Sequence, residues 1–217
     1  MRQGSCCPGN CINWAGKAFC SGQDLKDVAG KTRSLGESVE KRYNPMTRLV
    51  NTIEKPFICR LNGVAAGAGA GLALACDYVI AAESASFVFA FVNIGLVMDS
   101  GSSWTLPRLV GKRKAFELAT LGERISAKQA LELNMINQVV PDQELDAAVE
   151  AIAQRYAASA TKAIGLMKRM LNQATESSLE EALTMEMYCQ EIAGQTEDYK
   201  EGVLSFQEKR KAQFTGK

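Results

Sequence analysis

The 217-residue sequence contains no histidine. Catalytic triads that use a histidine base are therefore excluded, and so are zinc sites with a histidine ligand. Whatever chemistry the protein performs must use carboxylates, lysine, tyrosine, cysteine or backbone amides.

An excess of either charge is also absent, because 25 Lys and Arg residues stand against 24 Asp and Glu residues and leave a net charge of +1. This balance gives no electrostatic reason to expect a nucleic acid or a membrane surface as a partner. No apolar run reaches the roughly 18 to 20 residues that span a bilayer, and the longest, 63–82, is interrupted by Asp77. The opening residues, MRQGSCCPGN, lack the apolar stretch of a secretory signal. We therefore expect a cytoplasmic protein.

Cysteine patterns that bind metals are missing too, although the chain has seven cysteines. Cys6, Cys7 and Cys11 are close in sequence, but their spacing is not Cys-x2-Cys and no histidine can complete a site. The other four lie far apart among apolar neighbours: Cys20, Cys59, Cys76 and Cys189. We expect buried free thiols and no bound metal.

The residues that are present predict an α/β chain without internal repeats. Short apolar runs predict strands at 56–61, 78–82, 86–90 and 138–140. Helical spacing is found at 35–54, where it is broken near Asn44-Pro45, and at 72–76, 102–110, 112–120, 126–134, 143–158, 160–174, 178–193 and 196–211.

The composition divides the chain into three parts. Residues 1–14 show neither helical nor strand periodicity and are expected to be irregular, and residues 15–125 combine strands with glycine-rich turns. Residues 126–217 are nearly all helical, beginning with a capping box of Ser126 and Gln129 and with Asn134 as the expected end of that first helix. The boundary is therefore expected near residue 125.

A glycine-rich stretch, Gly-Ala-Gly-Ala-Gly at 67–71, lies between a predicted strand and a predicted helix. Small residues at a helix start let backbone approach a ligand and present unpaired N–H groups to an anion. The alternative is tight packing of the helix on the sheet without any ligand. The stretch matches neither a dinucleotide fingerprint nor a phosphate-binding loop. A second segment, 16–25, is a loop when considered alone, but beside the first it becomes another source of backbone donors.

Asp99 lies in a glycine- and serine-rich loop just before a predicted helix. The sequence alone favours it as the N-cap of that helix, because Asp-Ser-Gly-Ser-Ser is a good capping context. The alternative is a general acid or base. Asp77 and Glu83 are the nearest other acids, and both are interpreted as structural.

Residues 17–25, 62–77 and 95–108 resemble, in order, the three signature regions of the crotonase (enoyl-CoA hydratase/isomerase) superfamily, and the resemblance extends from Trp14 to the C-terminus. It implies a ββα spiral core, here truncated at its N-terminus, with an all-helical C-terminal region for oligomerisation. It also implies a homotrimer or a dimer of trimers that acts on an acyl-CoA thioester. No separate cofactor is implied, because coenzyme A is part of the substrate.

The resemblance also implies roles for individual residues. The amides of Gln23 and Ala68 match the oxyanion hole that holds the thioester oxygen, and Asp99 matches the acid/base aspartate of isomerase-like members, which reverses the preference for a cap. Matching positions for substrate or coenzyme A are Ser21, Gly22, Asp24, Leu25, Gly67, Gly69, Phe91, Trp104, Phe206 and Lys209. A basic helix such as the last one is otherwise usually a solvated face. Residues 67–70, 87–91 and 99–104 are most like those of members that isomerise the ring epoxide of a phenylacetyl-CoA thioester.

Hydratase members of the superfamily use two glutamates, which align with Gly71 and Phe91 of this sequence. Neither residue can move a proton, whereas shifting a double bond needs only one group that takes a proton and returns it elsewhere. Isomerisation is therefore favoured. Hydration, another crotonase reaction and a non-catalytic protein that binds acyl-CoA or oligomerises remain the alternatives.

The sequence departs from the family at its start, where members have several dozen further residues that form strands and a helix. The residues MRQGSCCPGNCIN fit no strand of that pattern. Loss of this region would expose sheet edges and apolar helix faces, so we expect impaired stability or activity relative to a full-length member.

Overall fold

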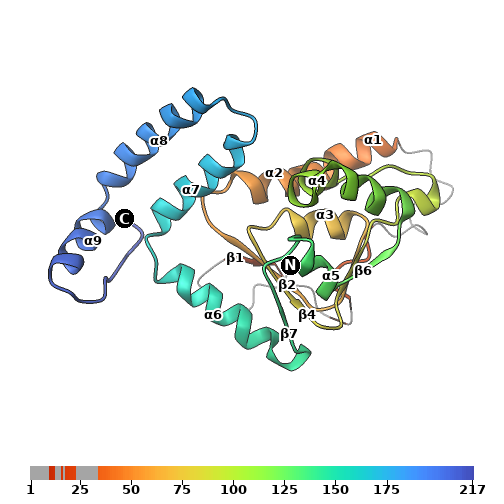
Figure 1. Ribbon diagram of the computed structural model, residues 1–217, viewed down its shortest axis with the longest axis horizontal. Coiled ribbons are helices and arrows are strands. Elements are labelled where there is room, and N and C mark those ends of the chain that lie inside the picture. Colours follow the sequence, from red (N-terminus) through yellow and green to blue (C-terminus); the bar gives the residue numbers. More distant parts are fainter. Residues whose placement is uncertain (1–9, 13–15, 17, 23–33) are drawn as a thin grey trace. The chain divides into compact units, whose positions relative to one another are not determined.

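The computed structural model describes residues 10–12, 16, 18–22 and 34–217 (Figure 1). These residues form a mixed α/β chain that divides into two compact units. The first unit comprises Cys11–Asn51 and Phe57–Val149, and the second comprises Thr52–Pro56 and Glu150–Lys217. The division falls within helix α6 (Leu145–Ala157), after the change of composition at residue 125.

Two sheets form the centre of the first unit. The larger sheet has the order β1-β2-β4-β7, and its strands are β1 (Asn10–Ile12), β2 (Phe57–Leu61), β4 (Tyr78–Ala82) and β7 (Gln138–Val140). The smaller sheet has the order β3-β5-β6, and its strands are β3 (Val64–Ala66), β5 (Ser86–Val88) and β6 (Arg124–Ser126). Pairing is parallel between β2 and β4, β4 and β7, and β3 and β5, whereas β5 and β6 are antiparallel.

Strands β2 and β4 are buried along almost their whole length, as expected for parallel strands that are covered on both faces. Leu61 and Ile80 are completely buried, and so is Phe87 of β5. Burying each such side chain stabilises the fold by about 1.5–3 kcal/mol. The apolar runs in the sequence therefore predicted the strands that hold this core together.

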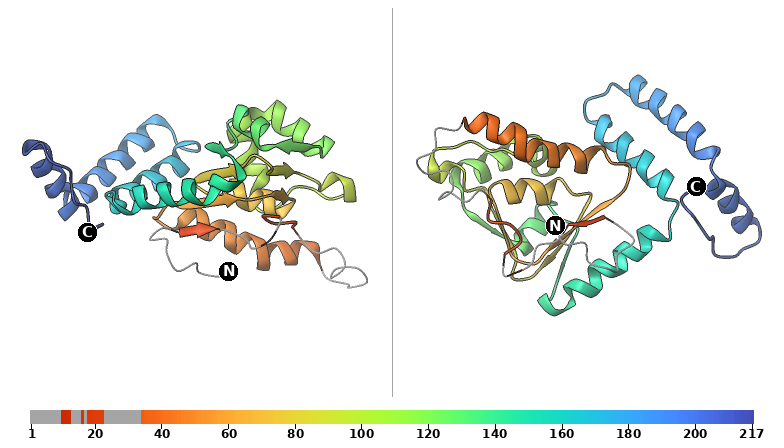
Figure 2. Two further views of the ribbon diagram at one scale, coloured as in Figure 1. Left: turned by 90° about the horizontal axis from the view of Figure 1, so that it is seen from below. Right: turned by 180° about the vertical axis from the view of Figure 1, so that it is seen from behind.

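The first unit's helices lie on either side of these strands (Figures 1 and 2). They are α1 (Leu35–Ser38), the π-helical η1 (Val39–Tyr43), α2 (Asn44–Thr52), α3 (Ala68–Leu74), the 3-10 turns η2 (Val92–Ile94) and η3 (Asp142–Glu144), α4 (Ser102–Leu121), α5 (Ala127–Glu132) and the start of α6. Gly111, at φ 76°, breaks α4 at the predicted place. The capping box of Ser126 and Gln129 is confirmed, and Asn134, at φ 58°, follows the end of α5.

The second unit contains three further helices, which are α7 (Thr161–Ala174), α8 (Leu179–Gly194) and α9 (Glu197–Gln207). Figure 2 shows α7 and α8 side by side. No described helix is both long and apolar enough to cross a membrane. The four cysteines expected as free thiols are confirmed, with Cys20 half-buried and the other three buried.

Several predicted boundaries are wrong, mostly because pairing partners limit an element. The strand predicted at 86–90 ends at Val88, since both of its partners are only three residues long. Strands β3 and β6 were not predicted, because three residues are too few to show alternation. Asn10–Ile12 is a strand rather than irregular, at the edge beside β2.

Helix boundaries differ for local reasons. The helix expected at 72–76 begins at Ala68, because Gly67 at φ 54° provides its start. The last helix ends at Gln207 rather than 211, because Lys209 has a left-handed φ of 53°. The expected break near Asn44-Pro45 is a π-helical segment just before α2, and Pro45 occupies a first turn, where its missing N–H leaves no bond unmade.

Candidate functional site

The two segments that were expected to supply backbone donors lie side by side in the first unit. Phe19 N and Cys20 N both donate to Val64 O at 3.1 Å, and Ala66 N donates to Cys20 O at 2.8 Å. The short stretch around Cys20 therefore runs along strand β3, immediately before the glycine-rich stretch. Parts of the chain about 45 residues apart thus meet at one point.

The glycines at this point permit the close approach of the two segments. An ideal Cβ at Gly69 would lie 2.5 Å from Cys20 O and 2.6 Å from Cys20 Cβ, which no side chain could tolerate. Gly22 has φ 80°, and a Cβ there would lie 3.0 Å from Ala66 O and 3.6 Å from Ala68 N. The glycine-rich stretch is therefore tightly packed, and this packing places Gly22 directly beside the Ala68 amide.

The Ala68 amide is the first N–H of helix α3. Gly67 has no side chain that could cap the helix, but its carbonyl oxygen accepts hydrogen bonds from Ala70 N (3.0 Å) and Gly71 N (3.2 Å). Within the described part of the chain, no residue accepts a hydrogen bond from Ala68 N–H. The ring of Phe91 is buried and lies 3.8 Å from the position of a Cβ at Gly67. An oxygen that accepted a hydrogen bond from the Ala68 amide would therefore lie at the N-terminus of α3, beside the apolar ring of Phe91.

Asp99 is half-buried, and its Oδ1 accepts a hydrogen bond of 2.8 Å from Ser100 Oγ. Burial raises the pKa of its carboxyl above the ordinary value, and the bond from Ser100 opposes that rise. The N-cap of α4 is Gly101, without any side-chain cap. The interpretation of Asp99 as a helix cap is therefore wrong, because the carboxylate does not bond to the first turn of α4.

The loop that carries Asp99 is held against α3. Ser100 has a left-handed φ of 53° and is buried, and Thr47 Oγ1 of α2 donates to its carbonyl at 3.2 Å. A Cβ at Gly71 would lie 2.6 Å from Ser102 Oγ and 2.9 Å from Ser100 Cβ. Because Gly71 is one helical turn from Ala68, the same contact sets the Asp99 loop relative to the Ala68 amide.

Sequence reasoning missed two residues of helices η1 and α2 beside this loop. Thr47 is separated from Ser100 by 53 positions, so nothing local in the sequence connects them. Tyr43 lies one turn before Thr47 in the π-helical segment, a conformation frequent at functional sites. Its own burial and, next, the negative charge of Asp99 raise the pKa of the Tyr43 phenol. The phenol is thus kept neutral in the neighbourhood of the carboxylate.

The remaining predicted site residues either lie outside the described residues or are exposed. Gln23, Asp24 and Leu25 lie outside the described residues, so the second amide of the oxyanion hole stays a prediction. Ser21 is exposed. Trp104 is 36% exposed, and the guanidinium of Arg108 lies 4.1 Å from its ring centroid.

Two predicted site residues, Phe206 and Lys209, belong to the second unit, and both are exposed. The side chain of Phe206 is 85% exposed, which is unusual for a ring of this size.

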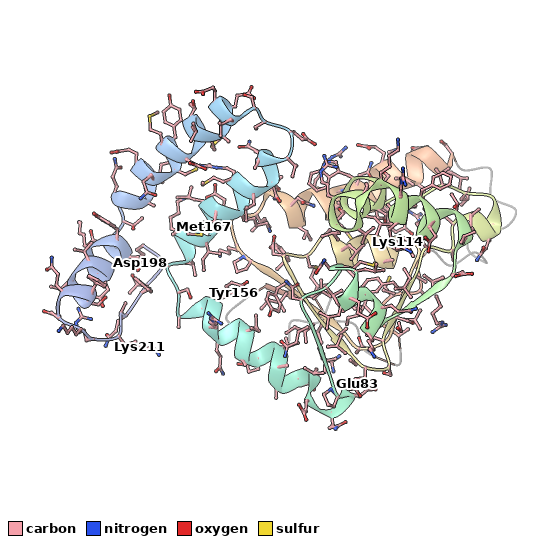
Figure 3. All side chains as sticks on the ribbon, viewed as in Figure 1. Glu83, Lys114, Tyr156, Met167, Asp198 and Lys211 are labelled. Carbon is pink, nitrogen blue, oxygen red and sulfur yellow. The ribbon has the colours of Figure 1, made fainter. Side chains whose placement is uncertain are left out.

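The two alternative acids, Asp77 and Glu83, lie in other structural positions. The Asp77 carboxylate accepts a hydrogen bond of 2.7 Å from Phe57 N and joins the starts of β2 and β4, while Glu83 lies in the exposed turn between β4 and β5 (Figure 3). Among the described residues, no cluster of acids and cysteines could hold a metal ion.

Known proteins resemble this chain along almost its whole length. The sequence profile described as enoyl-CoA hydratase/isomerase matches residues 12–217. The 1,2-epoxyphenylacetyl-CoA isomerase of Escherichia coli K12 is 48% identical over 210 residues, which cover 95% of this chain and 80% of that protein. A probable enoyl-CoA hydratase of Rhodobacter capsulatus is 39% identical, with the same coverage. The crystal structure of an enoyl-CoA hydratase from Bacillus anthracis matches with a TM-score of 0.90 at 34% identity, covering 95% of this chain and 81% of that one.

Proposed function

The chain belongs to the enoyl-CoA hydratase/isomerase family, and we propose that within this family it is an acyl-CoA isomerase. The proposed reaction shifts a double bond or a ring epoxide of an enoyl- or phenylacetyl-CoA thioester. The observation that carries the proposal is the position of Asp99, a half-buried carboxylate whose loop contacts the helix that begins with the Ala68 amide. The name of the E. coli relative supports an aromatic acyl group and a role in phenylacetate breakdown.

In the proposed mechanism the thioester oxygen accepts hydrogen bonds from the amides of Ala68 and Gln23. The Asp99 carboxylate takes a proton from the α- or γ-carbon of the acyl group, and the electron pair moves onto the thioester oxygen. The amides stabilise this enolate, and one such donor typically contributes about 10²–10³-fold to the rate. Asp99 then returns the proton to a different carbon, which completes the shift of the double bond.

The structure offers a physical reason against hydration at the two positions where hydratases carry glutamates. At Gly71 no side chain fits, since Ser100 and Ser102 occupy the space that its Cβ would need. At Phe91 a buried aromatic ring replaces a carboxylate. Adding water across a double bond needs groups that activate the water and protonate carbon. Because neither of these two positions carries a carboxylate and Asp99 remains as the proposed acid/base, isomerisation is the reaction that the described part of the site supports best.

Assays with three thioesters test this function. We expect the protein to isomerise a 3-enoyl-CoA or the ring-epoxide thioester and to hydrate crotonyl-CoA at least about 100-fold more slowly, the loss typical of a missing acid–base group. In D₂O the isomerised product should carry deuterium at the carbon that receives the proton. Crotonyl-CoA hydration as the fastest reaction would contradict the proposal. Coenzyme A binding measured by calorimetry, without turnover of any thioester, would favour a non-catalytic protein.

The pH dependence of turnover gives a second test. The base must be ionised, so kcat/KM should fall about tenfold per pH unit once the pH is below the pKa of Asp99. Because burial raises that pKa, the decline should begin above the ordinary range of an aspartate. The sequence contains no histidine, so a decline that begins above the ordinary range of an aspartate cannot come from an imidazole. A pH profile that is flat down to pH 4 would exclude Asp99 as the base.

The coenzyme A end of the substrate is assigned to α9. We propose that the exposed ring of Phe206 and the ammonium of Lys209 contact it, as an aromatic ring can stack on a base and a cation can pair with a phosphate. No cofactor beyond the substrate's own coenzyme A is proposed.

The expected trimer and the cytoplasmic location stay predictions. Exposed apolar side chains on α7 and α8, such as Met167, Leu171, Leu179 and Met187, agree with subunit contact, and sedimentation equilibrium would test it.

A further inference from the structure

Helix α9 ends in a Schellman motif that has lysine at the position where glycine is usual. Lys209 N donates to Phe206 O at 3.3 Å and Arg210 N donates to Ser205 O at 3.0 Å, the two bonds that define the motif. Lys209 has φ 53°. A side chain in this conformation costs free energy that glycine avoids. Such a cost is most often retained where the side chain serves a function.

The residue after Lys209 is held by two carboxylates of the same helix. Arg210 forms a bidentate ion pair with Glu201, with N–O distances of 2.6 and 2.8 Å, and its Nε lies 2.5 Å from Glu208 Oε2. Glu201 also accepts a bond of 2.8 Å from Gln213 N. The hydrogen bonds from Arg210, which have the largest effect, and the one from Gln213 N lower the pKa of Glu201 to about 2. We call Glu201, Glu208 and Arg210 the clasp.

The tail after the clasp returns along α9 and is fixed at its far end. The buried carboxylate of Asp198 accepts hydrogen bonds from Thr215 N (2.7 Å) and Gly216 N (2.9 Å), and Asp198 N donates to Lys217 O at 3.0 Å. Figure 3 shows Asp198 between the helix and this tail. Lys209 thus lies at a corner whose two sides are both anchored, so its backbone has little freedom.

We propose that Glu201 is a positioning residue for coenzyme A, which acts through Arg210 to hold Lys209 in the left-handed conformation and so fixes where its ammonium meets a phosphate of the thioester. This proposal rests on the proposed function, in which Lys209 contacts coenzyme A. The bidentate geometry orients the guanidinium more strictly than a single contact would, and therefore the backbone that precedes it. Phe206, which supplies one carbonyl of the motif, is set by the same turn.

The test compares two thioesters with the same acyl group, one of coenzyme A and one of pantetheine, which lacks the nucleotide phosphates. We expect Lys209→Ala to raise KM about fivefold for the coenzyme A thioester, the size of an exposed ion pair, without changing kcat. The pantetheine thioester should be used equally well by this variant and by the wild type. Equal turnover of that substrate also shows that the variant is folded.

Glu201→Gln should raise KM for the coenzyme A thioester by a similar factor and leave the pantetheine thioester unaffected. The double variant with Lys209→Ala should have the KM of Lys209→Ala alone, because both changes remove one interaction. Glu197→Gln is the matched control, since it removes the same charge from the same helix and breaks only an exposed pair with Lys200. It should change neither KM.

The possible failures are distinguishable. A wild type that turns over neither thioester would overturn the proposed function itself. A wild type active on both, with a Glu201→Gln variant that loses equally on both or adds its effect to that of Lys209→Ala, would overturn the positioning role alone. In that case the clasp only stabilises the tail.

Discussion

Replacing Asp99 by asparagine is expected to lower kcat by about 10³-fold, within the range that a general acid–base group contributes. Asparagine has nearly the same shape and can still accept the hydrogen bond from Ser100 Oγ, but it cannot take a proton. Binding of the acyl-CoA should therefore change little. Single-turnover kinetics with a 3-enoyl-CoA, together with loss of deuterium exchange in D₂O, measures the chemical step directly.

The same substitution should not destabilise the protein. Burial raises the pKa of Asp99 in the folded state, so the stability that this group contributes is present at low pH and is lost as the pH rises through the folded pKa. At neutral pH the buried charge therefore opposes folding, and Asp99→Asn should have an apparent Tm equal to or above that of the wild type. Glu83→Gln, in an exposed turn, is the control and should keep full activity. Normal turnover by Asp99→Asn would refute its assignment as acid/base.

Replacing Gly69 by alanine is expected to damage both the fold and the site. The added Cβ would lie 2.5 Å from Cys20 O and 2.6 Å from Cys20 Cβ, so the two segments must move apart. Overpacking of this kind costs about 1–3 kcal/mol of unfolding free energy. Because Cys20 and Gly22 are on the displaced segment, Gly22 and the Ala68 amide would lose their relative position. A loss in kcat of about 10²-fold should follow, as when one oxyanion donor is removed.

Urea unfolding measures the change in unfolding free energy. The value of kcat, measured at urea concentrations far below the unfolding transition, gives the effect on the site. Gly194→Ala is a matched control, because Gly194 ends helix α8 and a Cβ there meets no atom within 4 Å. That change should stabilise the protein by about 0.4–1 kcal/mol and leave turnover unchanged. If folded Gly69→Ala keeps the kcat of the wild type, then the contact between Gly69 and Cys20 does not set the geometry of the oxyanion site.

Much of this protein could be predicted from local patterns. The apolar runs at β2 and β4 predicted the central strands, the interruption at Gly111 predicted two helices, and Ser126 with Gln129 predicted a capped helix start. The resemblance of three ordered segments gave the family, which the match over residues 12–217 confirms. Such features depend on side chains a few positions apart, or on motifs read in order.

Only the tertiary structure decided that the Asp99 carboxylate does not cap helix α4. The residues around Asp99 form a good capping sequence, yet Gly101 is the cap, because Thr47 and Gly71 hold the loop in a left-handed turn at Ser100. Those contacts join residues from distant parts of the chain, so no local pattern records them. The end of α9 at Gln207 was equally hidden, since Lys209 rather than a glycine takes the left-handed position there, and the ion pair between Arg210 and Glu201 joins residues nine positions apart. The sequence by itself determined which side chains are available for chemistry, because it has carboxylates and no histidine. The packing between distant segments determined which of these groups lie close together in space, because such contacts leave no local pattern.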